Sequence, residues 1–460
     1  MLDSQLTVRA SARLLFVLLA ISAPGLESQT LEPNIADATE WLQRYVKIDT
    51  STIEGARESG TYLRSILHRA GVTTQWIISP AGQPFLYARS EASAPGAETL
   101  LLLHHLDVVP TGSDWTHPPF AAVIEDGALY GRGAVDDKSL GVAHLVAFLR
   151  HHQSSTTSQA VAFLAVGGEE DGGMEGTGWL IDSHPELFEG VSAVLTEGGS
   201  NRVYGEKLGW WGIEVAQKRP LWMLATATGR PGHGSSLNLH SAPHRLVRGL
   251  GRLIDRPLEF RLTPEAELFL ESLAPYESPA FRSVIEGLDA TLSQPEPVLG
   301  LLPGLPNYLV DSIQVNVLEA GSDLNVTPGS AAARIDVRLL PDTDELAFLA
   351  DLRELMGPDV RLQVLLSAPR TPPSPTDHPV FVCLQDQLSR SAPVIPAFIT
   401  AITDARFVRQ QNIPAYGFSP FALGTKALRG IHANDEHIPL GVFAQGVETM
   451  WRVVGTCTGS

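Results

Sequence analysis

Five short segments rich in Asp, Glu and His recur along the chain, and each follows a run of apolar residues. They are HHLDVVP (104–110), GRGAVDDK (131–138), GGEEDGG (167–173), LTEGG (195–199) and IHANDEH (431–437). Imidazole and carboxylate groups bind divalent metals, and short apolar runs are typical of strands buried on both faces. The same segments therefore predict a metal site and a sheet whose strands end beside it.

Helical and strand patterns alternate from residue 34 onward. Residues 36–48, 58–70 and 139–151 carry apolar residues at helical spacing, and Gly71 follows the second of these helices as a cap. Continuous apolar runs predict buried strands at 100–103, 161–166 and 191–195. This alternation predicts an α/β fold with a mainly parallel sheet, in which ligands bind beyond the carboxyl ends of the strands.

The length of 460 residues exceeds what one hydrophobic core supports, so we expect two domains. Near residue 217 the pattern changes to a strand, a Gly-rich turn and a helix, followed later by two alternating strands, a helix and a strand. We therefore expect a smaller α+β lid domain at 217–367, inserted into a catalytic domain formed by 31–216 and 368–460. The Pro-rich stretch at 368–379 is the expected exit linker.

Charge and cysteine content exclude several kinds of site. A net charge of −18 argues against a nucleic-acid partner, because binding phosphates requires a basic face. The two cysteines, Cys383 and Cys457, exclude a cysteine zinc cluster and leave at most one disulfide. Any bound metal must therefore be held by His, Asp and Glu.

The first thirty residues resemble a targeting segment. Two arginines precede an apolar run at 14–21, and small and polar residues follow it. This order predicts an export signal within 1–30 and a periplasmic or secreted protein, the alternative being a buried helix start or a frayed terminus. The run is too short to span a membrane, and no later segment qualifies.

Several of the acidic and imidazole residues have both a chemical and a structural explanation. His105 can bind a metal while Asp107 hydrogen-bonds its other ring nitrogen, or the two can form an ordinary polar pair at a strand end. Asp136 can bridge two metals or cap a helix. Glu169 and Glu170 repel each other unless a cation is near, which favours a metal over a solvated loop. One of them can then ligate while the other faces the attacking water.

These residues, in this order, resemble the zinc-dependent aminoacylase and carboxypeptidase family. It includes acetylornithine deacetylase, succinyl-diaminopimelate desuccinylase and vacuolar carboxypeptidase S, and the likeness is greatest to secreted N-acyl amino acid hydrolases. The resemblance covers residues from about 35 to 455. It implies a hydrolase domain with two zinc ions and an inserted lid that commonly forms a homodimer.

The resemblance also implies a role for each metal-site residue. His105 and Glu197 would hold one end of the metal pair, Glu170 and His432 the other, and Asp136 would bridge. Glu169 would be the general base, and Asp107 would orient His105.

Four further positions match substrate-binding residues of the family. His233 would reach into the active site of a second subunit and stabilise the oxyanion, while Asn325 and Arg338 would lie near the substrate in the lid. Arg406, in TDARF, would bind the substrate. The alternatives are a turn histidine, a loop asparagine and two arginines in salt bridges.

The chain departs from the family pattern in two places. Thr196 stands where several relatives have Asp or Asn, so one zinc would lose a ligand if that preceding position ligates rather than Glu197. His104 stands where relatives usually carry Gly. His437 is an alternative ligand to His432, although the resemblance favours His432 with support from the region of Glu436.

The expected reaction is hydrolysis of an amide bond in an N-acyl amino acid or a short peptide with a free C-terminal carboxylate. Two zinc ions would activate the water, with cobalt or manganese as possible substitutes, because two imidazole ligands favour zinc over magnesium. An arginine would bind the carboxylate. The alternatives are a di- or carboxypeptidase with the same site, and a non-catalytic binding protein on this fold.

Overall fold

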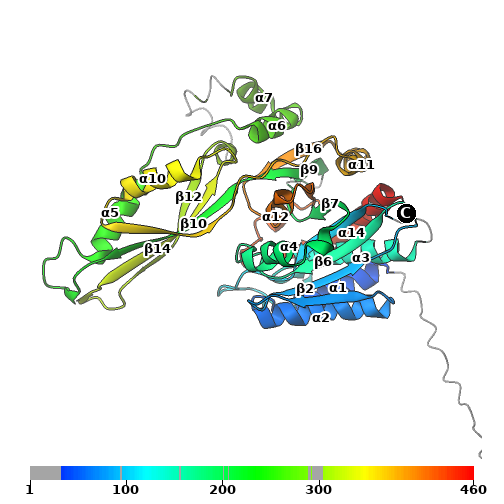
Figure 1. Ribbon diagram of the computed structural model, residues 1–460, viewed down its shortest axis with the longest axis horizontal. Coiled ribbons are helices and arrows are strands. Elements are labelled where there is room, and N and C mark those ends of the chain that lie inside the picture. The colour runs from blue at the N-terminus through cyan, green and yellow to red at the C-terminus, as the bar shows by residue number, and fades with distance from the viewer. Residues whose placement is uncertain are drawn as a thin grey trace, which may run out of the picture.

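The computed structural model describes residues 33–93, 96–154, 157–199, 201–205, 207–288, 292 and 304–459. Figure 1 shows two lobes, and the chain passes between them from β9 (Lys207–Gln217) to β10 (Arg219–Thr228). β9 belongs to the sheet of the larger lobe and β10 to that of the smaller lobe. The expected export signal at 1–30 lies outside the described residues.

A nine-stranded sheet forms the centre of the larger lobe. In order across the sheet its strands are β1 (Thr74–Ile78), β2 (Pro84–Arg89), β6 (Ala160–Val166), β3 (Thr99–His105), β7 (Val191–Thr196), β17 (Ala415–Gly417), β9 and β16 (Val394–Ile399), with β8 (Arg202–Tyr204) paired to β9. β3 runs parallel to β6 and β7, and β7 runs parallel to β17. The expectation of an α/β fold with a mainly parallel central sheet is confirmed.

Helices cover both faces of this sheet, which is why its central strands are continuous apolar runs. All seven residues of β3 and of β6 are buried. One face packs against α1 (Ile35–Val46), α2 (Ile53–Arg69), α3 (Lys138–Gln153) and α14 (Leu440–Thr458). The other face packs against α4 (Trp179–Ser183) and α12 (Ala405–Gln410). A strand buried on both sides has no polar face, so period-two alternation is absent from its sequence.

The helices expected at 36–48, 58–70 and 139–151 correspond to α1, α2 and α3, although α2 already begins at Ile53. A capping box formed by Asn34 and Asp37 begins α1. Gly71 follows the end of α2 with a φ of 78°, a left-handed conformation that glycine adopts without steric cost.

The smaller lobe has its own sheet and core. Its four antiparallel strands, in order, are β12 (Ser312–Ala320), β14 (Ser330–Leu339), β10 and β15 (Val360–Ser367). The helices α5 (Ala242–Ile254) and α10 (Glu345–Met356) pack on this sheet around Leu246, Leu250 and Leu352. Beyond the sheet, β11 (Gly232–His233) pairs with β13 (Val326–Thr327).

One segment of the expected lid domain packs instead with the larger lobe. It contains α6 (Pro264–Leu273), α7 (Pro279–Glu286) and the short 3-10 helix η4 (Leu305–Tyr308). Phe269 and Leu270 of α6 join the core of the larger lobe, where α6 packs against β16. The expected lid domain at 217–367 therefore included a segment that packs with the larger lobe, because the apolar face of α6 is buried outside the smaller lobe.

A three-stranded sheet brings the C-terminal part of the chain to the site. It consists of β4 (Val123–Glu125), β5 (Ala128–Tyr130) and β18 (His437–Pro439), and β18 pairs with β5. The IHANDEH segment, directly before and into β18, therefore lies beside the GRGAVDDK segment that follows β5. The short helix α13 (Thr425–Leu428) precedes it.

A disulfide joins Cys383 in α11 (Pro379–Leu388) to Cys457 near the end of α14. The two cysteines are 74 residues apart in the sequence. Among the helices of the described ranges, none combines the length and apolar character needed to cross a membrane.

Candidate metal centre

Three of the five acidic and imidazole segments follow neighbouring parallel strands. His105 is the last residue of β3, Glu169 and Glu170 come shortly after β6, and Glu197 directly follows β7. Parallel strands direct their carboxyl ends to one edge of the sheet, so these side chains meet there. Asp136 and His432 reach the same edge from the loops around β5 and β18.

Asp136 lies at the centre of the cluster and divides its two oxygens between two imidazoles. Its Oδ1 lies 3.1 Å from Nε2 of His105, and its Oδ2 lies 3.0 Å from Nε2 of His432. The alternative role of helix cap does not apply, because the residue that precedes α3 is Asp137. One carboxylate thus faces both histidines.

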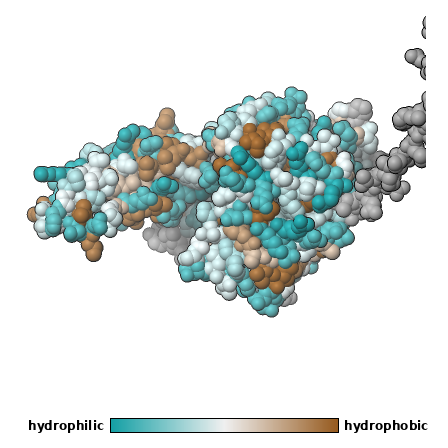
Figure 2. All heavy atoms as spheres, turned by 90° about the horizontal axis from the view of Figure 1, so that it is seen from below, coloured by the Kyte–Doolittle hydropathy of each residue, from teal (hydrophilic) through white to brown (hydrophobic). Residues whose placement is uncertain are grey.

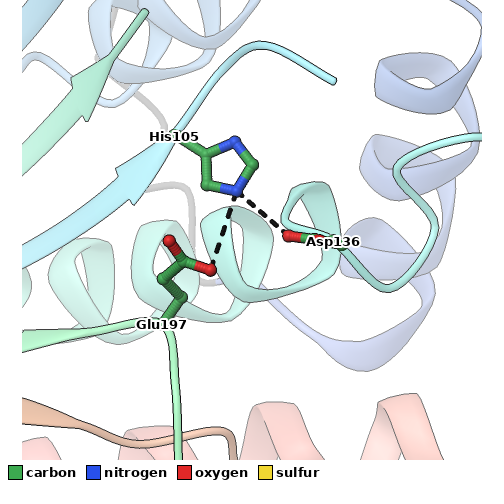
Figure 3. Close-up of side chains that lie close together, drawn as sticks. All are labelled: His105, Asp136 and Glu197. Carbon is green, nitrogen blue, oxygen red and sulfur yellow. Dashed lines mark hydrogen bonds and ion pairs between the residues drawn. The ribbon is translucent and has the colours of Figure 1, made fainter. Parts of the chain in front are cut away.

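Two groups of metal-binding side chains share this carboxylate. The first is His105, Asp136 and Glu197, drawn in Figure 3, where Glu197 Oε2 lies 3.8 Å from His105 Nε2. The second is Asp136, Glu170 and His432, where Glu170 Oε1 lies 3.3 Å from His432 Nε2. Within each group the donor atoms lie within 4.8 Å of one another.

The chemistry of these donors fits divalent metal ions. Oε1 of Glu197 is buried and has no hydrogen-bond partner among the described residues. Burial, together with the nearby Glu169, raises the pKa of Glu197 well above its ordinary value. Burying several carboxylates together is unfavourable unless a cation lies among them. Each donor group consists of one imidazole and two carboxylates, which is a set of ligands that zinc accepts.

Asp107 orients His105, but not through its carboxylate as expected. Nδ1 of His105 donates a hydrogen bond to the main-chain oxygen of Asp107 at 2.9 Å, while the carboxylate is 3.9 Å away. This bond leaves Nε2 as the free acceptor that faces the cluster. The carboxylate instead accepts hydrogen bonds from the main-chain amides of Gly168, Glu169 and Glu170, at 2.8, 3.3 and 3.0 Å.

A buried ion pair fixes the loop that carries Asp136. Glu436 lies 2.7 Å from Nη1 of Arg132, and its other oxygen accepts from the amides of Val135 and Asp136. Sequence reasoning noted the region of Glu436 but not this pair, although both residues lie inside the segments it singled out. His437, the alternative ligand, lies outside both donor groups and stacks on Tyr130.

Glu169 is buried beside the cluster and lines a cavity of about 870 Å³. Burial is the main reason that the pKa of Glu169 is raised well above its ordinary value. Most residues of the cluster line this cavity. The rest of its wall is largely apolar and includes Val109, Leu140, Trp222, Tyr308, Ile399, Phe421, Leu423, Leu428 and Ile431. Glu169 thus lies on the wall of a cavity that most of the metal-binding residues also line.

Arg338 extends from the smaller lobe into this cavity. Among the described residues that line the cavity it is the only arginine or lysine. Asp336 holds it through two hydrogen bonds of 2.7 and 2.8 Å, and the same carboxylate accepts from the indole of Trp222 at 3.0 Å. The salt bridge that was the structural alternative for Arg338 is therefore present, and it fixes the orientation of a guanidinium that also lines the cavity. Sequence reasoning missed the aspartate that forms it.

Arg406 does not lie where a substrate-binding arginine was expected. Its guanidinium is buried, is absent from the cavity wall, and donates to the main-chain oxygens of Thr403, at 2.9 Å, and Gly172. Among the residues that the structure describes, Arg406 also forms no salt bridge, because both of its hydrogen bonds go to carbonyl groups. Sequence alone could not show this, since the partners lie in two separate loops.

His233 and Asn325 lie together in the smaller lobe, outside the cavity of their own chain. The amide of Gly234 donates to the main-chain oxygen of Asn325 at 2.6 Å, and both His233 and Asn325 are exposed. His233 accepts a hydrogen bond from the hydroxyl of Ser235. Neither residue meets the metal-binding groups within one chain.

The two departures from the family pattern have structural explanations. Glu197 supplies its carboxylate to the first donor group, whereas Thr196 ends β7 with its hydroxyl buried. His104 is fully buried against α3, and a β-carbon added at Gly141 would lie 2.4 Å from its ring. The large side chain at 104 is accommodated because residue 141 is glycine.

Comparison with known proteins agrees with this geometry. A family model described as Peptidase family M20/M25/M40 matches residues 101–456. Aminoacylase-1A of Rattus norvegicus is 26% identical over 405 residues, which cover 86% of this chain and 88% of the relative. Aminoacylase-1 of Sus scrofa is 28% identical over 373 residues, covering 77% and 78% of the two chains.

Two solved structures share the fold at low sequence identity. An M20 family metallo-carboxypeptidase, Sso-CP2 from Sulfolobus solfataricus, has a TM-score of 0.71 at 19% identity, covering 92% of this chain and 100% of its own. Human carnosine dipeptidase 1 has a TM-score of 0.71 at 17% identity, covering 93% and 97%. The resemblance inferred from the sequence is thus confirmed. The chain belongs to peptidase family M20/M25/M40 and is a metal-dependent amidohydrolase.

Proposed function

We propose that this protein hydrolyses the amide bond of N-acyl amino acids, or of short peptides with a free C-terminal carboxylate, using two zinc ions. The observation that carries the proposal is the position of Asp136, whose two oxygens face the imidazoles of His105 and His432. Bound there, zinc would polarise the scissile carbonyl and acidify the attacking water.

Glu169 performs the proton transfers of the reaction. It accepts a proton from the water as the water oxygen bonds to the carbonyl carbon, and it then gives this proton to the amide nitrogen. The carbon–nitrogen bond breaks, and the products are a carboxylic acid and an amine. Support for this role comes from its position on the cavity wall beside the cluster.

Arg338 binds the carboxylate of the substrate. A guanidinium pairs with a carboxylate through two parallel hydrogen bonds, and Arg338 is the arginine that faces the cavity. The hydrogen bonds that Arg338 donates to Asp336 keep its orientation before substrate arrives. The apolar part of the wall accommodates the rest of the substrate.

The first test combines metal analysis with one substitution. Purified protein should contain about two zinc ions per chain, lose turnover on chelation and regain it with zinc. Glu169→Gln should keep the zinc but lose turnover by about 10²- to 10⁴-fold, because the proton acceptor is removed. Full activity of that variant would refute the role of Glu169, and a metal-free protein that zinc does not activate would refute the proposal.

The substrate class is tested separately with acyl chains of differing length. Turnover of N-acyl amino acids and none of dipeptides supports an aminoacylase. The reverse result supports a di- or carboxypeptidase with the same site. Cobalt and manganese are tested as replacements for zinc in the same assays.

We also propose a homodimer formed through the smaller lobe, in which His233 acts in the site of a second copy. His233 is exposed on a part of this lobe that also exposes Leu237, Leu239, Leu324 and Val326. Figure 2 shows apolar side chains at the surface of this lobe.

Mixing two inactive proteins tests the dimer. Glu169→Gln retains His233, and His233→Ala retains Glu169, so a mixed dimer contains one complete site. Recovery of activity on mixing, with dimer mass by light scattering, supports the proposal. A monomer, or a dimer without recovery, contradicts it.

Export is a further proposal, supported by the disulfide between Cys383 and Cys457. Disulfides persist in oxidising compartments and are rare in the cytosol. Cell fractionation with mass spectrometry of the N-terminus tests it. Recovery of the intact, uncleaved chain in the cytosol would overturn this proposal.

A further inference from the structure

The loop after β6, which carries Glu169 and Glu170, is held at both ends by hydrogen bonds. At its start, the carboxylate of Asp107 accepts from the amides of residues 168–170. At its far end, the main-chain oxygen of Gly172 accepts from Nη2 of Arg406. Gly172 has a φ of 91°, a left-handed conformation that residues other than glycine rarely adopt.

A second contact at the far end comes from Asp404. Its Oδ2 accepts a hydrogen bond from the hydroxyl of Thr177 at 2.7 Å, and both residues are buried. Gly173, also in this loop, packs closely against both Asp404 and Arg406, since a β-carbon there would lie 2.6 Å from Asp404 Oδ1 and 3.4 Å from Arg406 Nη2. Asp404 and Arg406, at the start of α12, therefore hold the loop from one side.

The second hydrogen bond of Arg406 connects it, through Thr403, to the segment that joins the two lobes. Its Nη1 donates to the oxygen of Thr403, and the same oxygen accepts from the side-chain amide of Gln217 at 3.2 Å. Gln217 is the last residue of β9, and β10 of the smaller lobe begins two residues later. The smaller lobe also touches the loop directly, because Leu366 and Trp222 pack against Gly172.

We propose that Arg406 is a positioning residue, which holds the loop of Glu169 and Glu170 against the metal centre and does not bind the substrate carboxylate. The hydrogen bonds of the guanidinium support this role, because both go to main-chain oxygens and one of these oxygens lies in the loop itself. The central carbon of its guanidinium lies over the ring of Phe407, 4.2 Å from the ring centroid. The inference rests on the proposed amide hydrolysis.

The test uses paired substrates that differ only at one end. One is an N-acyl amino acid with a free carboxylate, and the other is its carboxamide. Arg406→Met should lower kcat about 100-fold on both, with KM nearly unchanged, because a small displacement of Glu169 slows the chemistry without removing a binding contact. Arg406→Lys, which can keep one of the two bonds, should fall between this variant and the wild type.

Two comparison variants make the result specific. Arg338→Met should raise KM for the carboxylate substrate and leave the carboxamide little changed. Arg370→Met, which removes a half-exposed arginine paired with Glu265 at 3.4 Å, should leave both constants unchanged. If Arg406→Met does not fold, Thr177→Val tests the same loop by removing one hydroxyl, and should lower kcat about tenfold without changing KM.

Two results would overturn the inference. One is a rise in KM confined to the carboxylate substrate in Arg406→Met, since that shows carboxylate binding. The other is unchanged kcat in the folded variants, since the loop then needs no such support. Failure of the proposed function looks different, because wild-type protein would then hydrolyse neither substrate.

Discussion

His105 and Asp107 are joined through a main-chain oxygen: Nδ1 of His105 donates to the carbonyl group of Asp107 at 2.9 Å. The carboxylate of Asp107 is thereby free to bind the amides of the next loop, which carries Glu169 and Glu170. One residue thus positions a metal-binding group on β3 with its backbone and a second loop with its side chain.

Asp107→Asn should lower both zinc affinity and kcat/KM by about 10- to 100-fold. Each of its oxygens accepts from an amide of the loop, so an amide side chain places an N–H group against an N–H group at one of them. Competition with a chelator measures the affinity. Asp114→Asn, on an exposed loop, is the matched control, and equal behaviour of the two variants would show that the main-chain bond alone is sufficient.

Glu436→Gln should destabilise the chelated protein by about 3–5 kcal/mol, because it leaves the buried Arg132 without its counter-charge. Urea unfolding measures the change. Glu40→Gln breaks an exposed pair with Arg44, and we expect a change of less than about 1 kcal/mol there. Similar values for the two variants would contradict the importance of burial.

His144→Leu should reduce the sensitivity of the fold to acid. Burial lowers the pKa of His144 to about 3, so it stays neutral in the folded protein while the unfolded chain protonates near the ordinary value of 6.5. The contribution of His144 to stability is fully present above pH 6.5 and is lost as the pH falls toward 3.

The expected difference is measurable by urea unfolding of chelated protein at pH 7 and pH 5. Between these values the wild type should lose about 2 kcal/mol more than His144→Leu, at about 1.4 kcal/mol per pH unit below the unfolded pKa. His68→Gln removes an exposed histidine and serves as control. Parallel pH dependence of wild type and His144→Leu would refute the prediction.

Replacing both Cys383 and Cys457 by Ala should lower stability by about 2–5 kcal/mol, because the bond closes a long loop in the unfolded chain. Neither cysteine lines the cavity, so kcat and KM should not change. Unfolding of the wild type with and without reductant provides the comparison. A loss of activity without a loss of stability would be the contrary result.

The sequence predicted best what depends on local pattern. The run Leu100–Leu103 indicates a buried strand by itself, and the position of His105 at its end then follows from the geometry of parallel sheets. The packing of Phe269 against the larger lobe could not be read in this way, because the apolar face of a helix does not identify its partner. The segment around α6 was assigned to the wrong lobe for this reason.

The same distinction separates the residues of the site. Asp136 was identified because its segment and spacing matched a known pattern. Arg406 matched a pattern too, but the direction of its guanidinium depends on Gly172 and Thr403, which lie in different loops. Hydrogen bonds between distant segments leave no periodic signal in a sequence.

The metal-binding side chains all belong to the larger lobe, whereas Arg338 belongs to the smaller one. A substrate held at both ends must therefore span the space between two separately folded bodies. In the proposed reaction, the separation of the lobes would therefore set the length of substrate that reaches from Arg338 to the metal-binding groups.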